Sequence, residues 1–140
     1  MKQMILSMVR LPLWVHVWIW VLLLPINIAS LFFMDTATGL YGAIAIIFVL
    51  MVNSALILIN QGMSKVLAIP HLIAWGPLVI YIVWRALFGA GYIYWDNEAL
   101  LALGLLIVNI ISLGFDVYDT REWRAGNRSI IGFPEAKPRI

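Results

Sequence analysis

Four long apolar stretches, separated by short polar links, constrain this chain more than any other feature of its sequence. They cover residues 11–33, 40–59, 66–88 and 99–117. About 20 mostly apolar residues suffice to cross the hydrocarbon core of a bilayer as an α-helix. In lipid only a helix or a closed barrel satisfies the backbone, and these runs lack the period-2 alternation of barrel strands. We therefore predict an all-α, polytopic membrane protein with four transmembrane helices.

The links between the stretches indicate how the helices follow one another. The links at residues 34–39, 60–65 and 89–97 are short, and each contains glycine, asparagine or aspartate. Short links make sequential helices antiparallel neighbours, so we expect an up-down bundle. The bundle domain would cover residues 1–118, followed by a cytoplasmic tail at 119–140. A cleavable signal peptide is the alternative for the first stretch, which is longer than the usual apolar region of about 7–15 residues.

The composition excludes several classes of function. Of 140 residues, 64% are hydrophobic and 11% are charged, and cysteine is absent. A soluble domain carries roughly 25% charged residues. Without cysteine, thiol redox chemistry, thiolate metal sites and disulfides are excluded. The sequence has no phosphate-binding glycine loop and no paired-histidine zinc motif, and nothing supports nucleic-acid binding. We therefore lean against an enzyme.

The basic residues predict an orientation. If the N-terminus is cytoplasmic, eight of the nine lysines and arginines are cytoplasmic, and only Arg85 lies on the other side. Cytoplasmic loops of membrane proteins carry an excess of these residues. We therefore expect a multi-pass protein of the bacterial inner (plasma) membrane with both termini in the cytoplasm.

Polar side chains fall on one face of each predicted helix. At 100° per residue, the polar positions of each stretch line up, and polar groups within a membrane normally face the bundle interior. With the N-terminus inside, one group of polar residues lies in the cytoplasmic half. We predict a polar interior formed by Asn27, Asn53, Asn109 and Asp116. His16, His71, Asn53 and Asp116 would all belong to its cytoplasmic half.

The two histidines suggest a cofactor site. His16 and His71 lie in the first turns of two parallel helices at comparable depth. Two imidazoles that meet across a bundle could hold a b-type haem or a metal ion. Trp18, Trp20 and Trp75 would then form an apolar wall. The reading that we prefer gives each histidine one interhelical hydrogen bond, so no cofactor is predicted and haem b is the alternative.

The asparagines suggest a path for a small solute, although we favour a packing role for them. Interhelical hydrogen bonds from Asn27, Asn53 and Asn109 would join the helices. No glutamate lies within a stretch, so a small multidrug antiporter is not expected. We therefore favour a non-catalytic accessory or assembly subunit of a membrane complex, with other membrane subunits or further copies of itself as partners in the lipid bilayer. The alternatives are a haem or metal protein and an oligomeric solute channel or transporter.

Charged residues and prolines at the outer half shape the packing. Arg85 could pair with Asp96 or Glu98, which we interpret as a positioning contact. Asp96 or Asn97 is placed to cap the fourth helix. Pro25 and Pro77 fall inside the first and third stretches, where each removes a backbone hydrogen bond and tends to kink the helix.

The hydrophilic tail begins with a basic and aromatic segment. Its basic residues recur at spacings of three and four, as on a short helix that lies on an anionic membrane surface. Simple anchoring by positive charge is the interpretation that we favour. The predicted membrane-surface residues are Arg121, Trp123, Arg124 and Arg128.

Overall fold

The computed structural model describes residues 2–89, 91–92, 96–136 and 138, and their regular structure is helical. Four lengths of helix are long and apolar enough to cross a membrane, which agrees with the four predicted stretches. Two short 3₁₀ turns, Ser30–Phe32 and Lys65–Leu67, adjoin the longer helices. The helices are α1 (Lys2–Val9), α2 (Leu13–Val17), α3 (Leu24–Ala29), α4 (Ala37–Asn60), α5 (Ala68–Phe88) and α6 (Asn97–Arg124).

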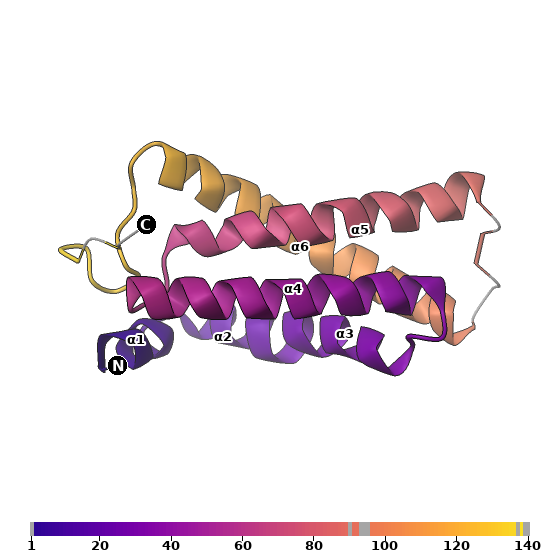
Figure 1. Ribbon diagram of the computed structural model, residues 1–140, viewed down its shortest axis with the longest axis horizontal. Coiled ribbons are helices and arrows are strands. Elements are labelled where there is room, and N and C mark those ends of the chain that lie inside the picture. Colours follow the sequence, from indigo (N-terminus) through magenta and orange to yellow (C-terminus); the bar gives the residue numbers. More distant parts are fainter. Residues whose placement is uncertain (1, 90, 93–95, 137, 139–140) are drawn as a thin grey trace.

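The long helices lie along one another (Figure 1). Both chain termini lie at one end of the long axis, together with the link between α4 and α5. We call this the termini end. The links from α3 to α4 and from α5 to α6 lie at the opposite end, which we call the far end.

The first long helix changes its winding before Pro25. Residues Trp18–Leu23 form a π-helical segment between α2 and α3, and Pro25 stands in the first turn of α3. Proline has no N–H group and its ring collides with the carbonyl four residues earlier. A wider π turn is a known way to accommodate such a break. The expected disturbance at Pro25 is thus a local rewinding of the helix upstream of the proline.

The core fills the space between the four long helices. It includes Ile46, Trp75, Ile82 and Leu105, each at most 1% exposed. Close packing is allowed by small residues: a Cβ atom built on Gly42 would lie 2.3 Å from the Ser30 Oγ. Side chains on the outer faces are largely exposed and apolar, as on a helix bundle that meets lipid.

A cap at the termini end joins three distant segments. The Met63 amide donates to the Ser7 Oγ of α1 at 3.0 Å, and the Ile131 amide donates to the Met63 carbonyl at 2.8 Å. The Arg10 Nη1 donates to the Gly132 carbonyl at 2.6 Å. Ile130 is 3% exposed beneath these contacts. The tail is therefore folded back onto the bundle over its described residues.

The basic and aromatic segment at the start of the tail belongs to α6. α6 continues through Tyr118 to Arg124 without a break, so Arg121 and Arg124 belong to its last turn. The predicted boundary at residue 118 falls inside this helix. The helix continues because no glycine or proline follows Gly114 before Gly126, whose φ is 100°.

Candidate functional site

Three polar clusters lie inside the bundle, at different heights along α6. Asp116, Asn109 and Glu98 each belong to one of them, and all three project from the same helix. Their spacing corresponds to a separation along the axis of about 10 Å between the first two and about 16 Å between the last two. We name them the termini-end cluster (Asn53, His71, Ser112, Asp116), the asparagine pair (Asn27, Asn109) and the far-end cluster (Thr38, Arg85, Tyr92, Glu98).

The termini-end cluster is centred on His71, in the first turn of α5. Its Nδ1 lies 2.9 Å from the Asp116 Oδ1 on α6, and its Nε2 lies 2.9 Å from the Asn53 Nδ2 on α4. The Ser112 Oγ donates to the other carboxylate oxygen of Asp116 at 3.3 Å. With an ionised Asp116, these contacts correspond to a neutral imidazole that carries its proton on Nδ1. Three helices are thus joined through one side chain.

Burial and an aromatic ring hold this imidazole in place. The side chains of His71 and Asp116 are 18% and 10% exposed. The indole of Trp75, one turn along α5, stacks on the imidazole with the ring centroids 4.2 Å apart and the planes 21° from parallel. The ring is therefore fixed by two hydrogen bonds at its edge and by one flat contact on its face.

His16 has different surroundings from His71. It is half-buried on α2, and its Nδ1 lies 3.2 Å from the Pro12 carbonyl of the same chain segment. The structure therefore gives the two predicted cofactor residues separate hydrogen-bond partners. A haem held by both histidines would require His71 to give up one of its two partners.

The asparagine pair joins α3 to α6. The Asn27 Nδ2 donates to the Asn109 Oδ1 at 2.9 Å, and the Asn109 Nδ2 donates to the Asn27 Oδ1 at 3.2 Å. The Asn27 Nδ2 also donates to the Leu23 carbonyl at 2.9 Å, next to the π-helical segment. Both asparagines are fully buried. Two of the three predicted interior asparagines therefore bond to each other.

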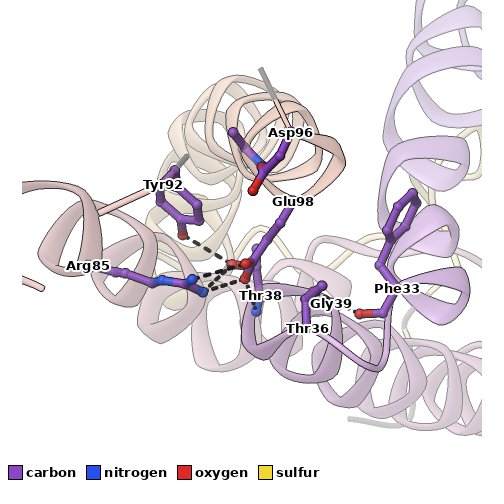
Figure 2. A network of polar contacts seen from close by, with 9 residues as sticks. Phe33, Thr36, Thr38, Gly39, Arg85, Tyr92, Asp96 and Glu98 are labelled. Carbon is purple, nitrogen blue, oxygen red and sulfur yellow. Dashed lines mark hydrogen bonds and ion pairs between the residues drawn. The ribbon is translucent and has the colours of Figure 1, made fainter. Parts of the chain in front are cut away.

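The far-end cluster is an ion pair surrounded by further hydrogen bonds (Figure 2). The Arg85 guanidinium of α5 meets the Glu98 carboxylate of α6 through two hydrogen bonds, one of which joins Nη2 to Oε2 at 2.9 Å. The Thr38 amide of α4 donates to the Glu98 Oε1 at 3.1 Å. Of the two predicted partners of Arg85, the structure selects Glu98, because Asp96 caps α6 by accepting from the Ala99 amide at 2.6 Å.

Tyr92 completes this cluster from the link between α5 and α6. Its hydroxyl lies 3.1 Å from the Thr38 Oγ1, and the Arg85 Cζ lies 4.6 Å from the centre of its ring. Burial raises the pKa of the Tyr92 phenol above its ordinary value of 10.0, so the hydroxyl stays protonated at neutral pH. The neutral ring therefore presents its face to the guanidinium, which is an attractive cation–π arrangement.

An apolar layer separates the asparagine pair from the far-end cluster. Leu105 is 0% exposed between the heights of Asn109 and Glu98, and Trp75, Leu78 and Ile82 belong to the same buried core. A groove of about 430 Å³ lies between α4 and α5, against the edge of this core. Two tyrosines and seven apolar residues line the groove. The tyrosines are Tyr41 and Tyr81, and the apolar residues are Ile44, Ala45, Phe48, Ile73, Ala74, Pro77 and Leu78.

The predicted membrane-surface residues lie around the end of α6. Arg121 and Arg124 are exposed, and the Arg128 Cζ lies 4.5 Å from the centre of the Trp123 ring. The neighbouring Glu122 pairs with Lys65 of the α4–α5 link at 3.3 Å. Contact of these arginines with lipid remains a prediction.

Ser112 and Thr38 were missed by the sequence reasoning. Ser112 lies four residues before Asp116 on the buried face of α6, so extension of the predicted polar face would have found it. Thr38 lies in the first turn of α4 and contributes its backbone amide, for which the sequence carries no comparable signal.

The chain was also compared with known proteins. No family model, no curated protein and no solved structure matches it.

Proposed function

We propose that this chain is a four-span integral membrane protein, an up-down helix bundle that acts as a non-catalytic accessory or assembly subunit of a larger membrane complex. The four apolar helices and their exposed apolar faces support insertion into a bilayer. The excess of lysine and arginine at the termini end supports a cytoplasmic location for that end, in a bacterial inner membrane.

The observation that carries the proposal is the mutual pairing of the polar clusters. His71 uses both ring nitrogens, Asn27 bonds reciprocally with Asn109, and Arg85 bonds Glu98 through two contacts. Hydrogen bonds and ion pairs of this kind join helices and set their register. The far-end and termini-end clusters each join α4, α5 and α6, as expected of a chain whose role is to keep a fixed shape beside a partner.

The groove between α4 and α5 supports the proposal, because it offers a surface on which a partner subunit could pack. Ile44 and Ile73 line it and are 57% and 59% exposed. Small or rigid residues at Ala45, Ala74 and Pro77 make the groove hollow, and small residues allow close approach of helices in membranes. A transmembrane helix of another subunit could pack there.

Purification of the tagged chain from its native membranes in a mild detergent tests the proposal. We expect other membrane subunits to migrate with the wild-type chain on a native gel. Replacement of Ile73 by tryptophan fills the groove and should release them. The matched control is Ile107→Trp, because Ile107 is 52% exposed in the middle of α6, on a surface outside the groove. A chain that runs alone, or a homo-oligomer that makes liposomes leak a small solute, would contradict the accessory role.

The haem or metal alternative has a direct test in the same preparation. A Soret band that is lost in both His16→Ala and His71→Ala variants would favour it. The present geometry favours it less, because Asn53 and Asp116 already bond the His71 ring.

A further inference from the structure

One atom of the termini-end cluster is left without a partner. The Asn53 Nδ2 bonds to the His71 Nε2, but the Oδ1 of the same amide is buried and accepts no hydrogen bond among the described residues. A buried acceptor without a donor is destabilising relative to a satisfied one, because it has lost its hydrogen bonds with water and gained none in the protein. In this structure, therefore, the Nδ2 of the Asn53 amide forms a hydrogen bond and its Oδ1 forms none with the described residues.

The unused oxygen matches what a protonated His71 would need. A neutral imidazole offers a lone pair at Nε2, which an amide N–H can approach. An imidazolium instead presents an N–H at Nε2, and requires an acceptor there. Rotation of the Asn53 amide by half a turn exchanges its Nδ2 and Oδ1, and so supplies that acceptor without moving the backbone.

The groups around the His71 imidazole favour the addition of one positive charge to it. An ionised Asp116 beside a neutral His71 leaves one negative charge in the cluster, and protonation of His71 makes the pair neutral overall. The Trp75 ring face, 4.2 Å from the imidazole, is a favourable position for a cation. Both features stabilise the imidazolium form once its Nε2–H is bonded.

Other charged groups reach this end of the bundle from the elements that pack against α5. The half of α4 that contains Asn53 has no titratable side chain. On the 3₁₀ turn before α5, Lys65 pairs with Glu122 of α6 at 3.3 Å, so these two charges offset each other. The groups that α6 contributes to this end are Asp116, Tyr118, Asp119, Arg121, Glu122 and Arg124.

We propose that the termini-end cluster is a binding site for one proton, taken up at the His71 Nε2 and received by rotation of the Asn53 side-chain amide. In this step one N–H bond forms at Nε2 from a solvent proton. The hydrogen bond from the Asn53 Nδ2 breaks, and a new one forms from Nε2–H to the Oδ1. The Nδ1–H bond to Asp116 stays in place. The chain would then carry a proton-dependent contact between α4 and α5, independent of any accessory role.

Nuclear magnetic resonance of the full-length chain in detergent micelles can test this site. The chain has only two histidines, so ¹⁵N-histidine labelling gives signals from two imidazoles, and a His16→Gln variant assigns them. At high pH we expect the His71 proton on Nδ1, with Nε2 bare. On acidification Nε2 should become protonated. The side-chain amide signals of ¹⁵N-labelled Asn53 should shift at the same midpoint.

An Asn53→Leu variant removes the acceptor and supplies the quantitative test. We expect the midpoint of the His71 signals to fall by about one pH unit, a tenfold loss of proton affinity. The His16 signals in the same sample are the control and should not move. The proposal is overturned if His71 carries its proton on Nε2 at high pH, if the Asn53 amide does not respond when His71 is protonated, or if the variant keeps the wild-type midpoint. The first two outcomes are read on the wild-type chain, so they do not depend on folding of the variant.

Discussion

Replacement of Asn27 by leucine should destabilise the bundle more than replacement of Asn109 by leucine. The structure gives Asn27 three side-chain hydrogen bonds, one to the Leu23 carbonyl and two shared with Asn109. Asn109→Leu removes only the two shared bonds. Interhelical hydrogen bonds contribute on the order of 0.6 kcal/mol each, up to about 1.7 kcal/mol. Leucine has as many side-chain heavy atoms as asparagine and a similar branched shape, so the substitution leaves little cavity.

The double variant isolates the contact between the two asparagines. Each single change removes both shared bonds and leaves the fully buried partner amide with unpaired polar atoms, so the two effects should not add. The two shared bonds predict a coupling energy of about 1.2 kcal/mol, with an upper bound of about 3.4 kcal/mol. The chain with leucine at both positions should therefore be more stable than the sum of the single effects implies.

Unfolding of the purified chain in mixed micelles of dodecyl maltoside and increasing dodecyl sulfate, followed by circular dichroism, measures these free energies. Asn97→Leu is the control, since Asn97 is exposed in the first turn of α6. A coupling energy near zero would refute the reciprocal pair. Equal effects of the two single changes would refute the additional role assigned to the bond with the Leu23 carbonyl.

Three further predictions concern the far end, the helix packing and the cap. Glu98→Gln should lower the free energy of unfolding by on the order of 2 kcal/mol, because it removes the negative charge from a partly buried bidentate pair with Arg85. The same micelle titration measures this change, and an unchanged midpoint of unfolding would argue against the pair. Gly42→Ala should be destabilising by about 1–3 kcal/mol through overpacking, whereas Gly114→Ala, where an added Cβ meets nothing within 4 Å, should be neutral or slightly stabilising. Equal effects of the two glycine substitutions would contradict the close approach at Gly42. Arg10→Gln should release the tail and speed its cleavage in limited proteolysis, because Arg10 contributes a 2.6 Å hydrogen bond to the tail backbone; a wild-type cleavage rate would show that other contacts hold the tail.

The long helices could be predicted from the sequence because length and apolarity alone determine them. The predicted limits of the second stretch, 40–59, fall within α4. The polar face of α6 could also be predicted, since the 100° periodicity aligns Asn109 with Asp116, and both are buried. These are properties of single helices, and a single helix carries its own periodicity in its sequence.

The partners of the polar residues could not be predicted in the same way. The sequence predicts that His16 and His71 lie at similar depth in the membrane. Which side chain contacts His71, however, depends on the axial shift and rotation of three helices. Asn53 and Asp116 are bonded to it because α4 and α6 both pack on α5. The short helix α1 gave no sequence signal because eight residues are too few for a distinctive pattern. Its contact with the tail also depends on residues far along the chain.

The cap has a consequence for the order in which the molecule is completed. Arg10 and Gly132 bond across 122 positions, so a nascent chain makes the first of these residues long before the second. During synthesis α1 is therefore made before the long helices α4, α5 and α6, and the Arg10 contact forms only after them. The contact of Ser7 with Met63 can form earlier, because Met63 lies in the link directly after α4. The cap is therefore completed in two steps, and a chain that stops before Gly132 would keep the Ser7 contact but lack the Arg10 contact.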